Sequence, residues 1–194
     1  MMDRKKAVEH ILNLLEVKLS SFVKYHSLEH SKDVIEQTKR LAESENITDI
    51  YTLDILITAA AFHDCGFLNT YFNHEEAGCE IAKEILPKFD YNDEDIQIIC
   101  DLIMATKVPQ HPLSQLQKII CDADLDYLGR DDFFEIGTNL YFEFLEMNII
   151  KDELSWNQLQ VKFLSSHAYF TETNRNLREK KKQQNLETVK QKIK

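Results

Sequence analysis

The stretch ILITAAAF at residues 55–62 constrains the fold of this chain more than any other feature. It is apolar on nearly all sides, which predicts a central, buried helix over residues 52–64. That helix ends in His63 and Asp64, two ionisable groups that are costly to bury unless something compensates both. A divalent metal would do so, because imidazole nitrogen and carboxylate oxygen bind the same ions. For an isolated pair, the alternative is a structural helix end with local hydrogen bonds.

The rest of the chain also favours helices. Only four glycines and three prolines occur in 194 residues, which leaves little punctuation for short strands. The spacing of apolar residues predicts helices over residues 3–20, 28–44, 74–86, 92–105, 113–121, 131–148 and 155–190. We therefore expect an all-α fold with one globular helical bundle over residues 1–174, a length that suits a single domain. A basic, exposed helical tail is expected at residues 175–194.

Charge and cysteine content exclude several classes of protein. The formal net charge of −10 argues against non-specific binding to nucleic acid. It does not exclude a small phosphorylated substrate, because a bound metal supplies local positive charge. No apolar run approaches the length of a membrane span, and the amino terminus lacks a signal-peptide pattern. The four cysteines show no Cys-x-x-Cys spacing, so we expect a reduced, cytoplasmic setting and leave homo-oligomerisation open.

Two further motifs flank the His-Asp pair. His26 and His30 are four residues apart and share one helical face. Further on, Asp122, Asp124 and Asp126 follow an apolar pair, and such crowding is unfavourable without a cation unless the segment is exposed. The order His, His-Asp, Asp supplies two nitrogens and two oxygens to one ion. Such a set leaves coordination positions open for water and substrate.

With this ordered set, residues 25–128 resemble the HD superfamily of metal-dependent phosphohydrolases. The resemblance implies an HD-type helical bundle that binds one divalent metal ion (Mn, Fe, Mg, Co, Ni or Zn). The ligands that match the family pattern are His30, His63, Asp64 and Asp124. The implied reaction is hydrolysis of a phosphoester of a nucleotide, or of another small phosphorylated metabolite, by metal-activated water. Asp64 would position or deprotonate that water.

Two more histidines are candidate catalytic residues. His26 occupies the place where cyclic-nucleotide phosphodiesterases of this superfamily keep a proton-donating histidine, so we predict that it protonates the leaving oxygen. A surface histidine, or one bonded to Glu29, is the alternative. His74 matches a histidine that helps to hold a second metal in binuclear relatives. Those relatives have a further histidine where this chain has Ala105, so we predict one tightly held metal, with a weak second site as the alternative. His74 is then expected to contact a phosphate or a metal-bound water, or to be a structural residue at the helix start. His111 is a candidate substitute from the nearby loop.

Basic residues that follow helices are candidates for phosphate contacts. We select Lys107 and Arg130 as substrate-binding residues, and Arg175 as a third to test. The alternative for each is an ordinary surface charge. His167, in a segment similar to the carboxyl end of small stand-alone bacterial HD proteins, is a further candidate for lining the pocket.

Two other functions compete with this hypothesis. A cyclic-nucleotide phosphodiesterase is supported by the Tyr25-His26 pair, but the chain lacks the extra helices that build a base pocket in those enzymes. A non-catalytic signalling or interaction module, stabilised by the metal, is the other alternative. The complete ligand set and His26 favour an enzyme, because a purely structural ion would tolerate a closed coordination shell.

Overall fold

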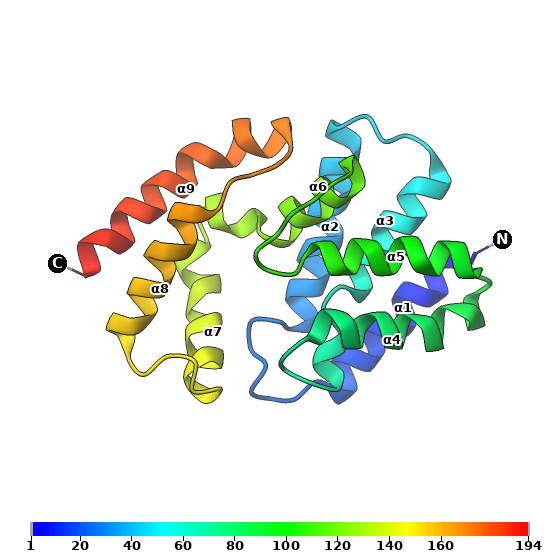
Figure 1. Cartoon of the computed structure of the whole chain (residues 1–194), viewed down its shortest axis with the longest axis horizontal. Helices are drawn as coiled ribbons and strands as arrows, with labels where there is room; N and C mark the ends of the chain where they lie inside the picture. The colour runs from blue at the N-terminus through cyan, green and yellow to red at the C-terminus, as the bar shows by residue number, and fades with distance from the viewer. Residues whose placement is uncertain (1, 194) are drawn as a thin grey trace.

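The computed structural model describes residues 2–193, and over that range the protein is built from helices without strands (Figure 1). Its α-helices are α1 (Arg4–Lys18), α2 (Leu28–Ser44), α3 (Ile50–Phe62), α4 (His74–Ile85), α5 (Asp93–Ala105), α6 (Gln115–Asp124), α7 (Phe133–Glu146), α8 (Glu153–Ser166) and α9 (Glu172–Lys192). Three short 3-10 turns complete the order: η1 (Cys65–Leu68), η2 (Leu86–Phe89) and η3 (Asp126–Gly129). The predicted all-α fold is confirmed.

Helix α3 lies at the centre of the bundle formed by α1 to α6. Helices α1, α2, α5 and α6 pack around it. Every residue from 55 to 62 is buried, and Leu56 and Phe62 are completely inaccessible. Burial of one such side chain contributes about 1.5–3 kcal/mol, so this helix is the main anchor of the core. The prediction of a central buried helix is confirmed. Because α3 ends inside the protein, the two residues that follow it, His63 and Asp64, are buried as well.

Helix α2 begins and ends at the residues predicted from its apolar spacing. Ser27 caps its first turn by accepting a hydrogen bond from the backbone N–H of His30 at 3.4 Å. Val34 and Leu41 are completely buried on the face that packs against α3. His30 lies on this buried side, so the amphipathic pattern of α2 places its imidazole inside the protein.

The turn η1 and the start of α4 approach each other so closely that residue 66 has to be glycine. A Cβ atom at Gly66 would lie 1.8 Å from the carbonyl oxygen of His74 and 2.8 Å from the backbone nitrogen of Gly78. The lack of a side chain at this point lets the two backbones touch. The contact fixes His74 beside the residues that follow α3.

Helices α7, α8 and α9 form a second layer beside the first bundle (Figure 1). Helix α8 packs along α9, and α9 packs on η3, the turn that follows α6. The prediction of one helix over residues 155–190 is wrong, because the chain leaves the helix after Ser166 and begins a new one at Glu172.

The break between α8 and α9 is held by one buried carboxylate. Asp122 of α6 accepts hydrogen bonds from the backbone N–H groups of Phe170 and Thr171, both at 2.8 Å, and from the Thr171 hydroxyl at 2.6 Å. Thr171 in turn caps α9 by accepting from the backbone N–H of Asn174 at 3.2 Å. Backbone groups that bond to Asp122 and Thr171 are not available to continue α8, which explains the turn.

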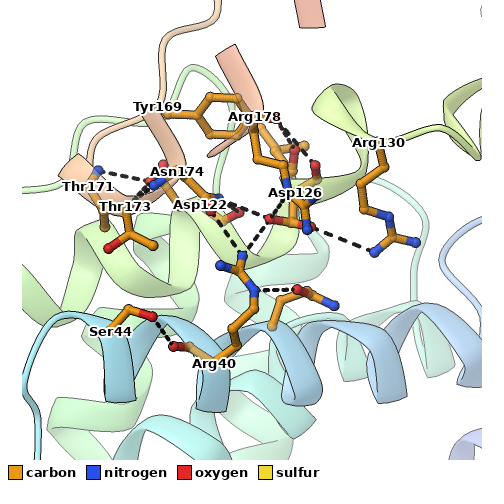
Figure 2. Close-up of polar contacts among 12 residues, drawn as sticks. Arg40, Ser44, Asp122, Asp126, Arg130, Tyr169, Thr171, Thr173, Asn174 and Arg178 are labelled. Atoms are coloured by element: carbon orange, nitrogen blue, oxygen red, sulfur yellow. Dashed lines mark hydrogen bonds and ion pairs between the residues drawn. The ribbon is translucent and has the colours of Figure 1, made fainter. Parts of the chain in front are cut away.

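Helix α9 is docked on the protein, and this corrects the expectation of an exposed tail from residue 175. Leu186 and Val189 are buried. Asp126, which is completely buried, binds Arg40 of α2 at 2.7 Å and Arg178 of α9 at 2.9 Å (Figure 2). This ion-pair cluster ties α9 to both η3 and α2. A domain boundary at residue 174 stays a prediction.

Two sequence-level expectations concern features away from the core. Among residues 2–193, the structure contains no helix with the combined length and hydrophobicity needed to cross a bilayer. The cysteines at positions 65, 79, 100 and 121 are all free and buried.

Candidate metal centre and its cavity

Four side chains from three helices meet where α3 ends. The Nε2 atoms of His30 and His63 lie 3.3 Å apart, and Asp124 Oδ1 lies 3.2 Å from the former and 3.6 Å from the latter. Asp64 Oδ2 lies 3.2 Å from His63 Nε2 and 3.5 Å from His30 Nε2. Ligands that bind one ion at 2.0–2.2 Å are separated from each other by roughly 3–3.5 Å. The mutual spacing of His30, His63 and Asp124 therefore suits a single ion, and Asp64 lies beside both histidines.

Local hydrogen bonds prepare these groups to bind a cation. His63 Nδ1–H donates to the carbonyl oxygen of Ala60 at 2.8 Å, which turns Nε2 toward the centre as the nitrogen that would bind a metal. Asp64 Oδ2 is buried without a hydrogen-bond donor among the described residues. An ionised oxygen in this position is costly unless a positive charge faces it. His30, His63 and Asp124 thus fit a divalent metal ion in both spacing and chemistry, and Asp64 adds a buried carboxylate beside the two histidines.

The electrostatics of the centre favour positive charge. Burial lowers the pKa of His63, but Asp64 and Asp124 raise it more, so its pKa is well above the ordinary value. Burial alone would raise the pKa of Asp124, yet hydrogen bonds to His30 and His63 bring it down to about 2. The same balance between burial and the neighbouring His63 lowers the pKa of Asp64. Both carboxylates are therefore ionised at neutral pH and stabilise a cation between them.

His26 lies beside the centre and is held by a buried glutamate. Its ring centroid is 6.2 Å from that of His30, and its Nδ1–H donates to Glu143 Oε1 at 2.5 Å. Glu143, completely buried on α7, also accepts from the backbone N–H of Tyr25 at 2.8 Å and from the Tyr71 hydroxyl at 2.8 Å. Burial lowers the pKa of His26, but the bond to Glu143 and nearby carboxylates raise it above its usual value. The imidazole is therefore disposed to carry a proton.

His26 and His74, the two catalytic candidates that are not proposed metal ligands, pack against the same aromatic ring. Phe67 of η1 stacks on His26 with centroids 4.3 Å apart and on His74 with centroids 4.1 Å apart. His74 Nε2 lies 3.5 Å from Asp64 Oδ1 and 3.5 Å from Glu75 Oε1. Both histidines thus flank the proposed ligands and line the adjoining cavity.

The basic candidates are placed differently. Lys107 lines the cavity, where it is paired with Glu76 at its exposed mouth. Arg130 lies outside the cavity and is bound by Asp33 at 2.7 Å and by Asp132 at 2.6 Å. Its assignment as a substrate-binding residue is corrected, because both edges of its guanidinium are occupied by carboxylates. Arg175 is exposed on α9, away from the described lining of the cavity.

Two histidines singled out in the sequence do not reach the cavity. His111 is exposed in the loop before α6. His167 packs against Tyr169, with centroids 4.8 Å apart, and its Nδ1 accepts a hydrogen bond from Lys182 at 3.4 Å. Burial and the Lys182 charge lower the pKa of His167 to about 4. His111 does not complete a second ligand set here, and the number of metals stays a prediction.

A cavity of about 460 Å³ opens directly from the centre. One end is lined by polar residues, among them Asp64, Asp124 and His26. The other end extends between α7 and α8, where the lining is almost entirely aliphatic and aromatic. A volume of this size suits a small organic ligand.

Glu143 and Tyr71 are the main residues that the sequence analysis missed. Glu143 is 117 residues from His26 in the chain, so no local motif connects them. One signal was available: on the predicted helix over residues 131–148, Glu143 shares the helical spacing of Gly137 and Leu140 and is the charged residue on that inward stripe. A carboxylate on a core-facing stripe indicates a buried partner.

Comparisons with known proteins agree with this geometry. The model of the HD domain family matches residues 27–126, which is more than half of the chain and includes all four proposed ligands. An all-helical fold with this centre and this match defines a class of hydrolases that bind divalent metals. The chain belongs to the HD domain family.

Two relatives illustrate the similarity. The crystal structure of a predicted HD superfamily hydrolase from an uncultured Thermotogales bacterium has a similar fold, with a TM-score of 0.62. That similarity covers 95% of this chain and 90% of the other, at 23% identity. An uncharacterised protein of Clostridium beijerinckii is 38% identical over 79 residues, which are 38% of this chain and 48% of that protein. The match therefore spans about half the length of this relative.

Proposed function

We propose that this protein is a metal-dependent phosphohydrolase that cleaves a phosphoester bond in a small phosphorylated molecule. The observation that carries the proposal is the convergence of His30, His63, Asp64 and Asp124 beside a histidine disposed to donate a proton. A metal with a purely structural role would not require such a donor, nor a cavity that opens on the ligands.

Each residue has a defined part in the reaction. When bound, the divalent ion lowers the pKa of water and neutralises phosphate oxygens. Asp64 orients the attacking water and accepts its proton. His26 donates its proton to the oxygen that leaves phosphorus, and Glu143 holds the imidazole in place through Nδ1. His74, beside His26, and Lys107 also line the cavity and would contact the phosphate.

The substrate class is a nucleotide or another small phosphorylated metabolite. A cyclic-nucleotide phosphodiesterase is the second candidate, supported by the Tyr25-His26 pair beside the metal centre. Both reactions need a proton at the leaving oxygen, so His26 suits either. They differ in the product, because a diesterase leaves a phosphomonoester and releases no inorganic phosphate.

The test is release of phosphate from 4-nitrophenyl phosphate and a panel of nucleotides, with Mn, Mg, Fe, Co, Ni and Zn supplied in turn. We expect metal-dependent turnover of the nucleotides that falls by at least a hundredfold in Asp64→Ala and in His26→Ala, as general acid–base groups typically contribute 10²–10⁴, whereas 4-nitrophenyl phosphate, whose leaving group needs no proton, should lose turnover in Asp64→Ala alone. His10→Ala, an exposed histidine on α1, is the control. Turnover that survives both substitutions would refute the assignment. Absence of turnover with every metal would favour a binding module.

A further inference from the structure

The cavity has a second region that the phosphohydrolase mechanism does not use. Beyond the metal centre it continues between α7 and α8 into a region that we call the apolar arm. Its walls are the side chains of Leu128, Phe133, Leu140, Phe144, Trp156 and Leu164. Phe133 and Leu164 are buried at 2% and 1% exposure, so they form the deep wall of the arm.

The apolar arm offers almost no hydrogen bonds to a ligand. Among the described lining residues from α7 and α8, Gln160 is the one with an amide side chain, and its Nε2–H already donates to Asn157 at 3.3 Å. Neither helix contributes a lysine, arginine, aspartate or glutamate to the described lining. A polar group placed here would lose its water without gaining a partner, at a cost of about 1–3 kcal/mol for each group.

Charge in the cavity is confined to the other end. Asp64, Glu75 and Asp124 line the end near the metal centre, and Lys107, the one lysine or arginine in the described lining, is paired with Glu76. A single phosphate can be neutralised by the metal, but a polyphosphate would place further negative charges against these carboxylates. The charge distribution favours a substrate with one phosphate group.

Two exposed apolar side chains line the cavity next to the Lys107–Glu76 pair. They are Phe72 and Val108, which are 63% and 55% exposed. Large exposed side chains of this kind at the rim of a cavity are typical of ligand-binding sites. A hydrophobic group would therefore meet compatible surface beside Phe72 and Val108 as well as in the apolar arm.

We propose that the substrate is a phosphate monoester of a largely apolar alcohol, alkyl or aryl, whose organic group occupies the apolar arm. This inference rests on the proposed phosphohydrolase function and specifies its substrate. In the reaction, the oxygen of water forms a bond to phosphorus and the bond from phosphorus to the alcohol oxygen breaks. The proton of His26 goes to that oxygen, and Asp64 takes one from water. The products are the free alcohol and inorganic phosphate.

A nucleotide fits this cavity less well. The edges of a nucleobase and the ribose hydroxyls carry several donors and acceptors, and the apolar arm leaves them unpaired. A site built to recognise such groups rejects analogues that lack them, whereas a hydrophobic site discriminates by size. The structure therefore predicts selection by chain length.

The first test measures hydrolysis of n-alkyl phosphates from ethyl to decyl by the metal-loaded full chain. We expect kcat/KM to rise about fourfold for each added methylene until the arm is filled, which is the factor for burying one methylene group. A kcat/KM that is independent of chain length, or that is higher for nucleoside monophosphates than for octyl phosphate, would overturn the proposal.

The second test is independent of catalysis. Trp156 is the single tryptophan of the chain and lines the apolar arm, so its fluorescence reports on occupancy. We expect octylphosphonate, which cannot be hydrolysed, to change the emission and to bind at least tenfold more tightly than ethylphosphonate. If the emission changes but no phosphate ester is cleaved, the proposed function fails while the ligand chemistry stands. If esters are cleaved but octylphosphonate has no advantage, the present inference fails alone.

A variant of α7 links both tests to the arm. A Cβ atom at Gly137 would lie 3.8 Å from Gln160 Oε1 and 3.9 Å from Trp156 Cζ2, so a methyl group fits and a larger side chain projects between α7 and α8. Gly137→Leu should lower the preference for octyl over ethyl phosphate about tenfold, equivalent to about two methylenes. Asn139→Leu, on the exposed side of the same helix, is the matched control and should keep the preference. An unchanged preference in a folded Gly137→Leu protein would refute the assignment of the arm.

Discussion

Replacing Glu143 with glutamine tests how the proton donor is held. The carboxylate accepts hydrogen bonds on both oxygens: Oε2 from the backbone of Tyr25, and Oε1 from His26 Nδ1 and the Tyr71 hydroxyl. An amide has the same shape but only one acceptor oxygen. If that oxygen faces the backbone donor, the NH₂ group confronts the Nδ1–H of His26, and the imidazole must give up that proton. Glu143→Gln therefore lowers the pKa of His26.

The magnitude follows from the bond that is lost. A hydrogen bond to a charged group contributes about 1.5–3 kcal/mol. If the bond is needed to keep His26 protonated and oriented, kcat falls by roughly 10- to 150-fold. The free energy of unfolding should fall by a similar 1.5–3 kcal/mol, because Glu143 is completely buried.

The assay compares two leaving groups across a pH series. Nitrophenolate leaves without a proton, so 4-nitrophenyl phosphate should be cleaved by Glu143→Gln at nearly the unmodified rate. An alkyl phosphate needs the proton, so its kcat should fall and the alkaline limb of its pH profile should move to lower pH. Glu146→Gln, exposed on the same helix, is the control and should change stability by less than about 0.5 kcal/mol. Equal effects on both substrates, or an alkaline limb that does not move, would refute the role of Glu143.

Three further outcomes are expected. Gly66→Ala should destabilise the fold by roughly 3 kcal/mol and lower the melting temperature by about 6–12 °C, because its Cβ meets the backbone of His74; a small shift in thermal unfolding would contradict this close approach. A divalent metal at a hundredfold excess over its Kd should stabilise the protein by about 2.7 kcal/mol, and a chelator or Asp124→Ala should abolish the gain in calorimetry. His167 has a folded pKa of about 4, below its unfolded value, so the unfolded chain takes up its proton first. The free energy of unfolding should therefore fall between pH 6.5 and 4 by up to about 1.4 kcal/mol per pH unit, and His167→Gln should flatten that slope in denaturant titrations.

Local patterns in the sequence predicted the elements of the first bundle well. The bounds of α2 matched at both ends because Ser27 supplies a cap and the apolar stripe is regular. Helix α5 begins within one residue of the predicted start and ends at the predicted Ala105, and Asn92 caps it through a capping box with Asp95. Likewise, the order of the His-Asp motif anticipated that His30, His63 and Asp124 would meet, because α3 is apolar on all sides and must lie at the centre.

Predictions that depend on distant partners were less successful. The end of α8 is determined by Asp122, which lies in α6, so helical periodicity alone extended the helix too far. Arg130 comes only six residues after the proposed ligand Asp124 in the sequence. In the structure, however, ion pairs with Asp33 and Asp132 keep its side chain outside the cavity. Glu143 escaped notice for the same reason, because its partner His26 lies at the opposite end of the chain. Pairings of this kind are determined by tertiary packing and leave little trace in local spacing.

The alternating carboxylates at the end of α6 have a consequence for how the protein can be dissected. Asp124 lies between two anchored residues in the sequence. Asp122 accepts hydrogen bonds from the α8–α9 turn, and Asp126 forms an ion pair with Arg178 of α9. The carboxyl-terminal layer of α7, α8 and α9 therefore fixes the position of the metal-ligand candidate Asp124, and it also lines the cavity. Shortening the chain before residue 170 would remove the donors to Asp122 and one of the arginines bound to Asp126, so docking of the last helix and ion affinity should rise and fall together.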